Sequence, residues 1–485
     1  MVSVATGLGF QFIIARALSK PEYDLWFNIN DIGAYFTILA GVLPFWTLRF
    51  VARDKEGAVK TGIVANLSIS VIATIIYLAI VPFVISALHI DPAYLPLYLL
   101  IAVQIIEYYS MNVMEACLQA RIPQAVGYGW IIQQVSKLAL GCALIMRLNL
   151  LLWGAVTATI AAFAFQMFYY GKLLAPEFKQ KIRWEYITQW LKGSLGTIYN
   201  VAGSQIATYI FIMLFAFGGE GARSRLGASA TIVNVITYAS FLAYALYPKL
   251  LAEKKREDIT TSMKMVLMFS VPLTAGAIAL SDSYVTILKA DYADSAIILV
   301  VLAIDAFFTT VSGLYGAVLF GVENLDEQGS VSIRQLVKSR IFVAFSLPYV
   351  HSAITLPTAY YVLTNVVHGE PFLAALYVSI INSSVRFAMF LVQYILVRQM
   401  VKVNIPWRSI GKYVFAASMM GIALYVAPHP TRVSYTVIET AIGGLFYLAV
   451  LAVIDEDARL LIRDAWQMTK GLMQKLRRII GRVRK

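Results

Sequence analysis

Long runs of residues without charge constrain this sequence more than any other feature. Residues 67–88 contain no Asp, Glu, Lys or Arg, and residues 148–171 contain none either. About 20 apolar residues in an α-helix span the ~30 Å hydrocarbon core of a bilayer. Because no water is present there, the backbone must satisfy its own hydrogen bonds in a helix or a closed barrel, and the alternating segments of a barrel are not found. The sequence therefore predicts an all-α polytopic membrane protein.

Composition supports this fold class and excludes several functions. Of the 485 residues, 59% are hydrophobic and only 14% are charged, against roughly 25% charged in a soluble domain. The net charge of +13 resides in short loops between apolar runs, so it indicates membrane topology and no nucleic-acid partner. Cys117 and Cys142 both fall inside apolar segments, and the four histidines are scattered. We therefore expect no disulfide framework, no metal site and no cofactor.

Apolar runs separated by Pro, Gly and charge clusters divide the chain into about fourteen transmembrane helices. The first run is short, so either this helix is short or the natural start lies further upstream. The predicted spans are residues 1–15, 25–48, 61–88, 95–119, 125–146, 150–171, 193–217, 227–248, 265–288, 295–320, 340–367, 371–397, 411–427 and 434–454.

The distribution of Lys and Arg predicts the orientation of these spans. With fourteen spans and a cytoplasmic N-terminus, 31 of the 40 basic residues fall on the inner side, 7 on the outer side and 2 inside helices. Cytoplasmic loops of membrane proteins carry an excess of Lys and Arg. We therefore expect a multi-pass protein of the cytoplasmic membrane with both termini inside.

The two halves of the chain resemble each other. The segment HIDPAYLPLYLLIA (residues 89–102) lies 200 residues before KADYADSAIILVVL (residues 289–302), and each connects one apolar helix to the next. This predicts two six-helix lobes related by an axis along the membrane normal, followed by two additional helices. The expected units are an N-terminal lobe (1–172), a cytoplasmic linker (173–192), a C-terminal lobe (193–398), two further transmembrane helices (399–454) and a basic tail (455–485).

Two segments resemble a known transporter family. ARALSKPEYDLW (residues 15–26) is similar to the ARxLGPxEYG signature that follows the first helix of polysaccharide transporters. PLTAGAIALSDSYVTILKADYADSA (residues 272–296) resembles the ninth-helix region of the same family. These are the O-antigen-type oligosaccharide flippases of the multidrug/oligosaccharidyl-lipid/polysaccharide exporter superfamily. The resemblance implies two six-helix lobes with two extra helices and a lipid-linked oligosaccharide as substrate.

The sequence departs from relatives at two places. Asp24 stands where the family signature has Gly. The Arg/Asp/Arg cluster of peptidoglycan-precursor flippases has no match, because the first helix carries only Arg16, at its outer end. This argues against lipid II as the substrate.

Charged residues inside predicted spans are the first candidates for function, since a charge at the bilayer centre costs about 2.5–3.5 kcal/mol on translocon scales. Lys137 and Arg386, one in each lobe, are candidates to bind the pyrophosphate of a lipid-linked glycan. Asp31, Glu107 and Asp305 are candidates to bind a coupling proton or sodium ion. The alternative is structural: Glu107 pairs with Lys137, and Asp305 pairs with Arg386. Both interpretations stay open at this point.

Polar side chains also recur on the helices that line the cleft between lobes in related transporters. The sugar-binding candidates are Asn28, Asn30, Asn200 and Gln205. Their alternative role is hydrogen bonding between helices, as amide side chains do in many membrane bundles.

The C-terminal segment GLMQKLRRIIGRVRK (residues 471–485) places apolar residues along one helical stripe among six basic residues. This pattern is typical of an amphipathic helix on an anionic membrane surface. A docking arm for a glycosyltransferase is the alternative.

The sequence thus favours a flippase that moves a lipid-linked oligosaccharide by alternating access. No Walker, HExxH or GxSxG motif occurs, so we expect neither catalytic residues nor an enzyme. The expected partners are membrane lipid, the lipid-linked glycan, a coupling proton or sodium ion, and a glycosyltransferase or polymerase of the same pathway. A cation-coupled multidrug antiporter is the first alternative, and a membrane glycosyltransferase is the second.

Overall fold

The computed structural model describes residues 2–243, 256–322, 340–401, 404–429, 431–456, 458–460 and 463. Within these residues the regular structure is helical. Two predicted features lie outside the described residues. They are the final part of the span 227–248, including Pro248, and the amphipathic tail at 471–485.

The first half of the chain forms seven α-helices with short helical turns between them. They are α1 (Val2–Ala17), α2 (Lys20–Phe36), α3 (Val42–Ala52), α4 (Ala58–Ala87), η1 (Pro92–Tyr94), α5 (Leu95–Arg121), α6 (Pro123–Gly141), the π-helical turn η2 (Cys142–Arg147), α7 (Leu151–Leu174) and η3 (Ala175–Lys179).

The linker helix α8 (Trp184–Gly193) leads into the second half. Its helices are α9 (Leu195–Ala207), α10 (Tyr209–Phe217), α11 (Ala222–Thr237), η4 (Tyr238–Ala243), α13 (Arg256–Ala279), α14 (Ser281–Leu288), η5 (Ala290–Ser295), α15 (Ala296–Val322), α17 (Arg340–Asn365), α18 (Pro371–Met400), α19 (Trp407–Val426) and α20 (Val433–Ile454).

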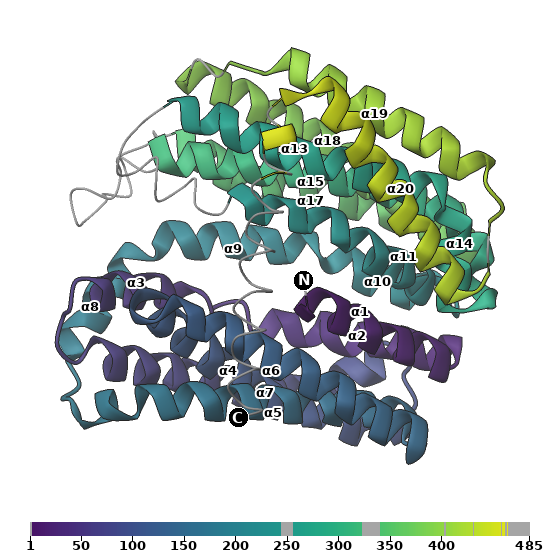
Figure 1. The fold of residues 1–485 in the computed structure, drawn as a ribbon. Helices are drawn as coiled ribbons and strands as arrows, with labels where there is room; N and C mark the ends of the chain where they lie inside the picture. Colours follow the sequence, from purple (N-terminus) through teal and green to yellow (C-terminus); the bar gives the residue numbers. More distant parts are fainter. Residues whose placement is uncertain are drawn as a thin grey trace, which may run out of the picture.

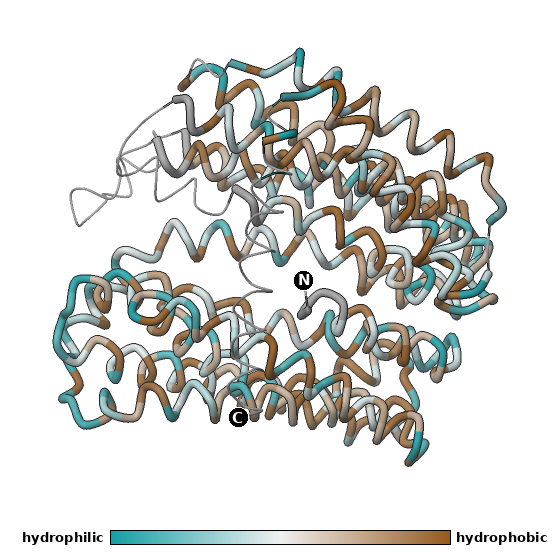
Figure 2. Tube along the Cα trace, in the orientation of Figure 1, coloured by the Kyte–Doolittle hydropathy of each residue, from teal (hydrophilic) through white to brown (hydrophobic). Residues whose placement is uncertain are grey.

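These helices form two bundles that run side by side, α1–α7 in one and α9–α20 in the other (Figure 1). Hydrophobic residues occupy most of each helix, and hydrophilic residues gather at the turns (Figure 2). Among the described helices, ten are long and apolar enough to cross a membrane. The predicted all-α polytopic membrane fold is confirmed.

Every predicted span is helical over most of its described residues, but five spans are divided. The predicted span 125–146 is divided between α6 and the π-helical turn η2. The predicted span 25–48 is split between α2 and α3, and 193–217 is split at Thr208 between α9 and α10. The span 227–248 becomes α11 and η4, and 265–288 becomes α13 and α14. Hydropathy did not reveal these breaks, because residues on both sides of each break are apolar.

The break between α2 and α3 shows how a helix can stop inside a bundle. A break frees backbone carbonyls that have no water to bind, so side chains must donate to them. The buried amide of Asn66 on α4 donates to Ala40 O at 3.3 Å and to Tyr109 O at 2.6 Å. The hydroxyl of Tyr109 on α5 donates to Phe36 O at 3.1 Å. Two side chains from neighbouring helices therefore satisfy the broken segment.

The two halves of the chain pack in the same order. In the first half α1 contacts α6, α4 contacts α5, and α7 contacts both α5 and α6. In the second half α9 contacts α17, α13 contacts α15, and α18 contacts both α15 and α17. The short turns η1 and η5 also precede the corresponding helices α5 and α15. A duplicated six-helix unit would produce this pattern.

Turns predicted to share one side of the membrane do meet at one end of the molecule, which we call the α14 end. There Lys289 Nζ donates to Leu18 O at 2.9 Å, and Gly219 lies against Gly369. At the opposite, α8 end, the side-chain carbonyl of Gln180 accepts from Gly57 N. The alternation of turns follows the predicted topology, and which end faces the cytoplasm stays a prediction.

We predict that Asn66→Leu lowers the free energy of unfolding. The substitution removes the donor to Ala40 O, the carbonyl freed by the break, and an unpaired buried carbonyl costs about 1–3 kcal/mol. Denaturant unfolding of the purified protein in detergent measures the change. Asn112→Leu is the matched control, because Asn112 donates only to Tyr108 O of its own helix. Equal losses in both variants would contradict the assignment.

Candidate functional site

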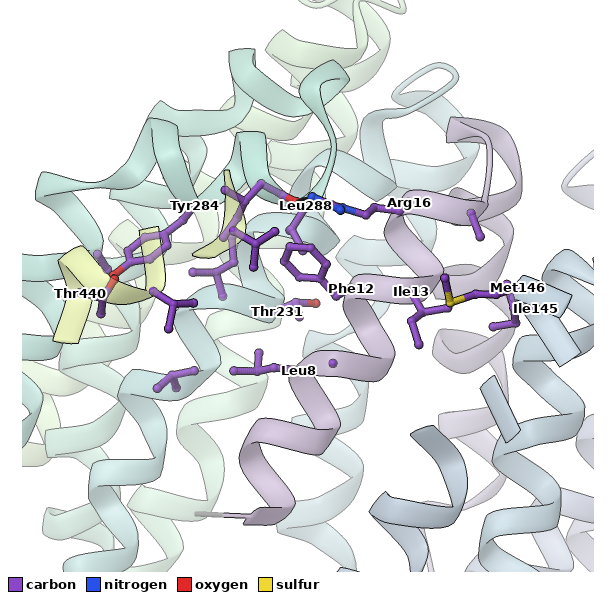
Figure 3. A pocket seen from close by; sticks show the side chains of 18 of the residues that line it. Leu8, Phe12, Ile13, Arg16, Ile145, Met146, Thr231, Tyr284, Leu288 and Thr440 are labelled. Atoms are coloured by element: carbon purple, nitrogen blue, oxygen red, sulfur yellow. Dashed lines mark hydrogen bonds between the residues drawn. The ribbon is translucent and has the colours of Figure 1, made fainter. Parts of the chain in front are cut away.

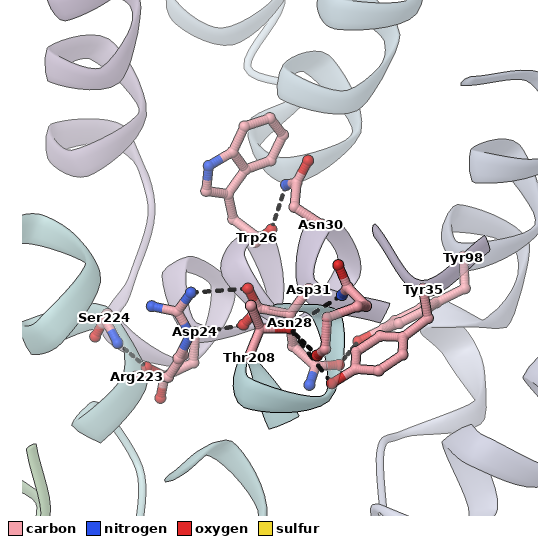
Figure 4. Close-up of polar contacts among 11 residues, drawn as sticks. Asp24, Trp26, Asn28, Asn30, Asp31, Tyr35, Tyr98, Thr208, Arg223 and Ser224 are labelled. Carbon is pink, nitrogen blue, oxygen red and sulfur yellow. Dashed lines mark hydrogen bonds and ion pairs between the residues drawn. The ribbon is translucent and has the colours of Figure 1, made fainter. Parts of the chain in front are cut away.

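The two bundles are joined near the α14 end by a carboxylate of α2 that binds the start of α11. Asp24 is buried, and its two carboxylate oxygens accept from Gly221 N and Ser224 N, each at 2.5 Å (Figure 4). The first N–H groups of a helix have no partner within the helix and carry partial positive charge. Asp24 therefore stabilises α11 from across the interface between bundles.

One and a half to two turns further along α2, an ion pair joins the same two helices. Arg223 of α11 donates through Nε and Nη2 to the two oxygens of Asp31, at 2.7 and 2.9 Å (Figure 4). Only 7% of the Arg223 side chain is exposed. Its guanidinium lies 4.6 Å from the ring centre of Phe27 and 4.9 Å from that of Phe211. Bidentate pairing and two aromatic faces fix the cation in one position.

The close approach of α2 and α11 depends on a glycine. A Cβ atom at Gly227 would overlap the ring of Phe27. Any larger residue there would push the two helices apart and weaken the ion pair one turn away.

Hydrogen bonds extend this contact along α2 (Figure 4). Asn28 is fully buried, and its carbonyl accepts from the Tyr98 hydroxyl at 2.6 Å. The hydroxyl of Thr208, at the break between α9 and α10, lies 3.4 Å from the Tyr35 hydroxyl. Asn30 donates to Trp26 O of its own helix at 2.6 Å.

Behind Arg223 lies a polar cavity of about 350 Å³, which we call the arginine cavity. It is enclosed by α11, α15 and α18, with Phe27 and Phe211 at one side. Its charged lining residues are Arg223, Asp305 and Arg386. Its neutral polar lining residues are Thr231, Asn234, Thr237, Thr309, Ser379 and Asn382.

A second ion pair crosses this cavity. Arg386 of α18 donates through Nη1 to Asp305 Oδ2 of α15, where Asp305 is buried and 37% of the Arg386 side chain is exposed. The other oxygen of Asp305 has no hydrogen-bond partner among the described residues. Arg386 has five N–H donors, so it retains donors for a ligand while paired.

An apolar crevice of about 1080 Å³ lies beside the arginine cavity (Figure 3). Its walls are α1, η2 and the start of α7 in the first bundle and α11, α13, α14 and α20 in the second, and most of its lining atoms belong to aliphatic or aromatic side chains. Thr231 of α11 lines both the crevice and the arginine cavity. At the α14 end of the crevice, Arg16 lies over the Phe12 ring at 4.6 Å and donates to Ile287 O at 2.8 Å.

The structure brings part of the predicted site together. Arg386 and Asp305 line the arginine cavity. Asp31 does not line it, but it pairs with Arg223, which does. Asn28 of α2 accepts a hydrogen bond from Tyr98 of α5, and Asn30 donates a hydrogen bond within α2. On α9, the amide of Gln205 donates to Thr208, and Asn200 is half-buried.

The other two charged candidates lie elsewhere in the first bundle. Lys137 on α6 is not among the lining residues of the arginine cavity, and its Nζ lies 5.2 Å from the ring centre of Phe10. Glu107 on α5 is buried, and its Oε2 has no hydrogen-bond partner among the described residues. No ion pair between Glu107 and Lys137 is present in the described part of the chain, whereas the pairing considered for Asp305 and Arg386 is present.

Arg223 and Asp24 are the residues that sequence reasoning missed. Arg223 fell in a predicted outer loop because hydropathy placed the start of this span at residue 227. The helix begins at Ala222, directly after two glycines with positive φ, Gly219 and Gly221. Closely spaced glycines mark a tight turn, and a helix that begins directly after this turn would include Arg223.

Solved structures share this architecture. An inward-facing multidrug resistance MATE family transporter of the MOP superfamily superimposes with a TM-score of 0.61 at 14% identity, covering 83% of this chain and 96% of its own. The lipid II flippase MurJ, in an inward closed conformation, gives 0.61 at 15% identity over 95% and 98%. The chain has the fold of MOP-superfamily transporters.

A third similar structure is a MOP-superfamily transporter from Pyrococcus furiosus, described as having a binding pocket of reversed polarity. It gives a TM-score of 0.54 at 15% identity over 82% of this chain and 93% of its own. No protein-family model matches the sequence, and no curated protein matches it.

We predict that Asp31→Asn and Arg223→Gln each lower the free energy of unfolding by roughly 3–5 kcal/mol, because each leaves one buried charge alone. The double variant should cost less than the sum, since neither charge remains. Denaturant unfolding in detergent gives the double-mutant cycle.

The control cycle uses the exposed pair of Arg183 and Glu56, 3.4 Å apart, where the coupling should be about 0–1 kcal/mol. Additive losses at Asp31 and Arg223 would contradict a coupled pair.

Proposed function

We propose that this chain is a flippase that moves a lipid-linked oligosaccharide of the polyprenyl-phosphate type across the cytoplasmic membrane by alternating access. The observation that carries the proposal is the juxtaposition of two unlike cavities at Thr231. A cavity lined by two guanidinium groups, a carboxylate and several hydroxyl and amide groups adjoins an apolar crevice about three times larger. A molecule with an anionic head and a long apolar tail matches both.

The lining of the arginine cavity favours an anionic head. Its charged lining residues are two arginines and one aspartate, and Asp31 pairs with Arg223 from outside the lining, so an excess of positive charge arises there when Asp31 separates from Arg223. Arginine binds phosphate oxygens through parallel N–H donors. The surrounding hydroxyl and amide groups, such as Asn234 and Asn382, provide donors and acceptors for sugar hydroxyls.

The contacts of α2 with α11 supply a closure that alternating access requires. In this conformation Asp24 and Asp31 hold the two bundles together at the α14 end. Opening that end would break both contacts and transfer Arg223 from Asp31 to another anion or to water. A phosphate in the arginine cavity would compensate Arg223 as Asp31 separates from it.

The proposal includes a cytoplasmic location for the α8 end, where basic turns lie. Lys137 and Glu107 stay candidates for substrate binding and for proton or sodium coupling in the first bundle. Glycosyltransferases or a polymerase of the same pathway are the expected functional partners, and the chain itself is expected to perform no catalysis.

The first alternative, a cation-coupled multidrug antiporter, needs a carboxylate that is free to bind a cationic drug. Asp305 is the one acid in the lining of the arginine cavity, and it is paired with Arg386. The pair therefore favours an anionic substrate. A membrane glycosyltransferase is the less favoured alternative, because the fold is that of transporters.

We predict that deletion of this chain leaves lipid-linked oligosaccharide on the inner leaflet. The head would then be protected from a lectin or glycosidase added outside, and surface glycan would be lost. Right-side-out cells and permeabilised cells give the protected fraction. Unchanged surface glycan without such accumulation, in cells with no redundant transporter, would exclude the proposal. If the deletion abolished drug efflux instead, the result would favour the antiporter.

We predict that Arg386→Ala reduces this flipping by at least tenfold, because one of two phosphate-binding groups is lost. Arg398→Ala is the matched control, since Arg398 is an exposed arginine in the last turn of the same helix. The exchange of Asp305→Arg with Arg386→Asp should restore folding, measured by thermal unfolding, without restoring transport. Full transport by the exchanged pair would show that the two residues serve only as an ion pair.

A further inference from the structure

A cluster of ionisable groups at the α14 end holds the last two helices against the second bundle. His429 belongs to the turn between α19 and α20, and its Nδ1 lies 2.6 Å from Asp282 Oδ2 in the first turn of α14. The imidazole also packs edge-on against Tyr425 of α19, with ring centres 6.0 Å apart. These contacts join three helices through one titratable ring.

A second carboxylate faces the same ring from α20. Glu439 interacts electrostatically with both His429 and Asp282, and its two carboxylate oxygens are enclosed without hydrogen-bond partners among the described residues. Directly beside it, the Tyr284 hydroxyl of α14 lies 2.8 Å from the Thr440 hydroxyl of α20. His429 is therefore placed to compensate two carboxylates.

Solvent reaches this cluster. A surface hollow of about 470 Å³ is lined by Ser281, Asp282, Tyr425 and His429. The side chain of His429 is 24% exposed and that of Asp282 is 50% exposed. Protons can exchange with the imidazole while α20 stays in place.

From this geometry we propose that His429, Asp282 and Glu439 form a pH-sensitive latch that fastens α19 and α20 to α14 when His429 is protonated and releases α20 when it is neutral. The protonated ring pairs with Asp282 and offsets the charge of Glu439. The neutral ring leaves two carboxylates facing each other, and like charges at short range repel. The Tyr284–Thr440 hydrogen bond then remains as a neutral contact.

The direction in which the pKa of His429 departs from its ordinary value sets the pH range in which the latch opens. The hydrogen bond that the His429 ring donates to the Asp282 carboxylate is the main cause that raises the pKa of His429 above its ordinary value, while burial acts in the opposite direction. A group with a raised pKa in the closed state stabilises that state fully below its ordinary value, about 6.5. This stabilisation is lost as pH rises through the raised pKa. The latch should therefore be closed in acid and open in mild alkali.

Release of α20 would change the apolar crevice. Val433, Val437 and Thr440 of α20 form one wall of the crevice, opposite α1. A loosened α20 would widen the crevice towards the surrounding lipid. The latch itself depends only on contacts within this chain and does not rest on the proposed function.

Spin labels at two exposed positions, Ala293→Cys in η5 and Ser434→Cys in the first turn of α20, test the latch. The protein carries Cys142→Ser, because Cys142 is exposed, and keeps the buried Cys117. Distances between labels are measured from pH 5.5 to 8.5 in detergent and in lipid nanodiscs. We expect a narrow, short distance at low pH and a broader, longer one at high pH, with a midpoint above about 6.5.

The variant His429→Asn should keep the broad distribution at every pH, and Asp282→Asn should lower the midpoint or abolish the transition. His89→Asn is the matched control, because His89 is an exposed histidine in another interhelical turn, and its transition should equal that of the parent protein. A parent distance that does not change with pH, or a transition that survives in His429→Asn, would overturn the proposal. Neither result bears on flipping, which is measured separately.

Discussion

The structure depends on one constraint: inside the bundles, charges and backbone groups must find partners within the protein, because hydrocarbon offers none. Asp24 meets this constraint by binding the free N–H groups of α11, and Asp31 meets it by pairing with Arg223. The break after α2 meets it through Asn66. The same interactions that satisfy buried groups also determine how the two bundles contact each other.

This constraint connects stability with the proposed transport. A buried ion pair contributes little net stability compared with apolar packing, yet breaking one by removing a partner is costly. An anionic substrate that compensates Arg223 while Asp31 separates from it would lower that cost. An arginine paired across the interface between the bundles, as Arg223 is with Asp31, is therefore suited both to hold a closed state and to make its opening depend on a bound anion.

In the proposed function, the apolar crevice and the arginine cavity would recognise different parts of the substrate. The crevice would provide area for an apolar chain without directional contacts, and the cavity would provide directional donors for a head group. Thr231 lies at the boundary between them. The helix α20 forms one wall of the crevice, which gives this additional helix a structural role.

The sequence by itself determined the all-α membrane fold and where most helices lie along the chain, because hydropathy and charge act locally and leave periodic signals. It also singled out Asp31, Asp305 and Arg386, since a charge within an apolar run is visible in one dimension. Only the tertiary structure decided that Asp31 pairs with Arg223, that Lys137 lies apart from Arg386, and that His429 meets Asp282. Those partners lie 147–192 residues apart, and helix packing, which leaves no local pattern in the sequence, brings them together.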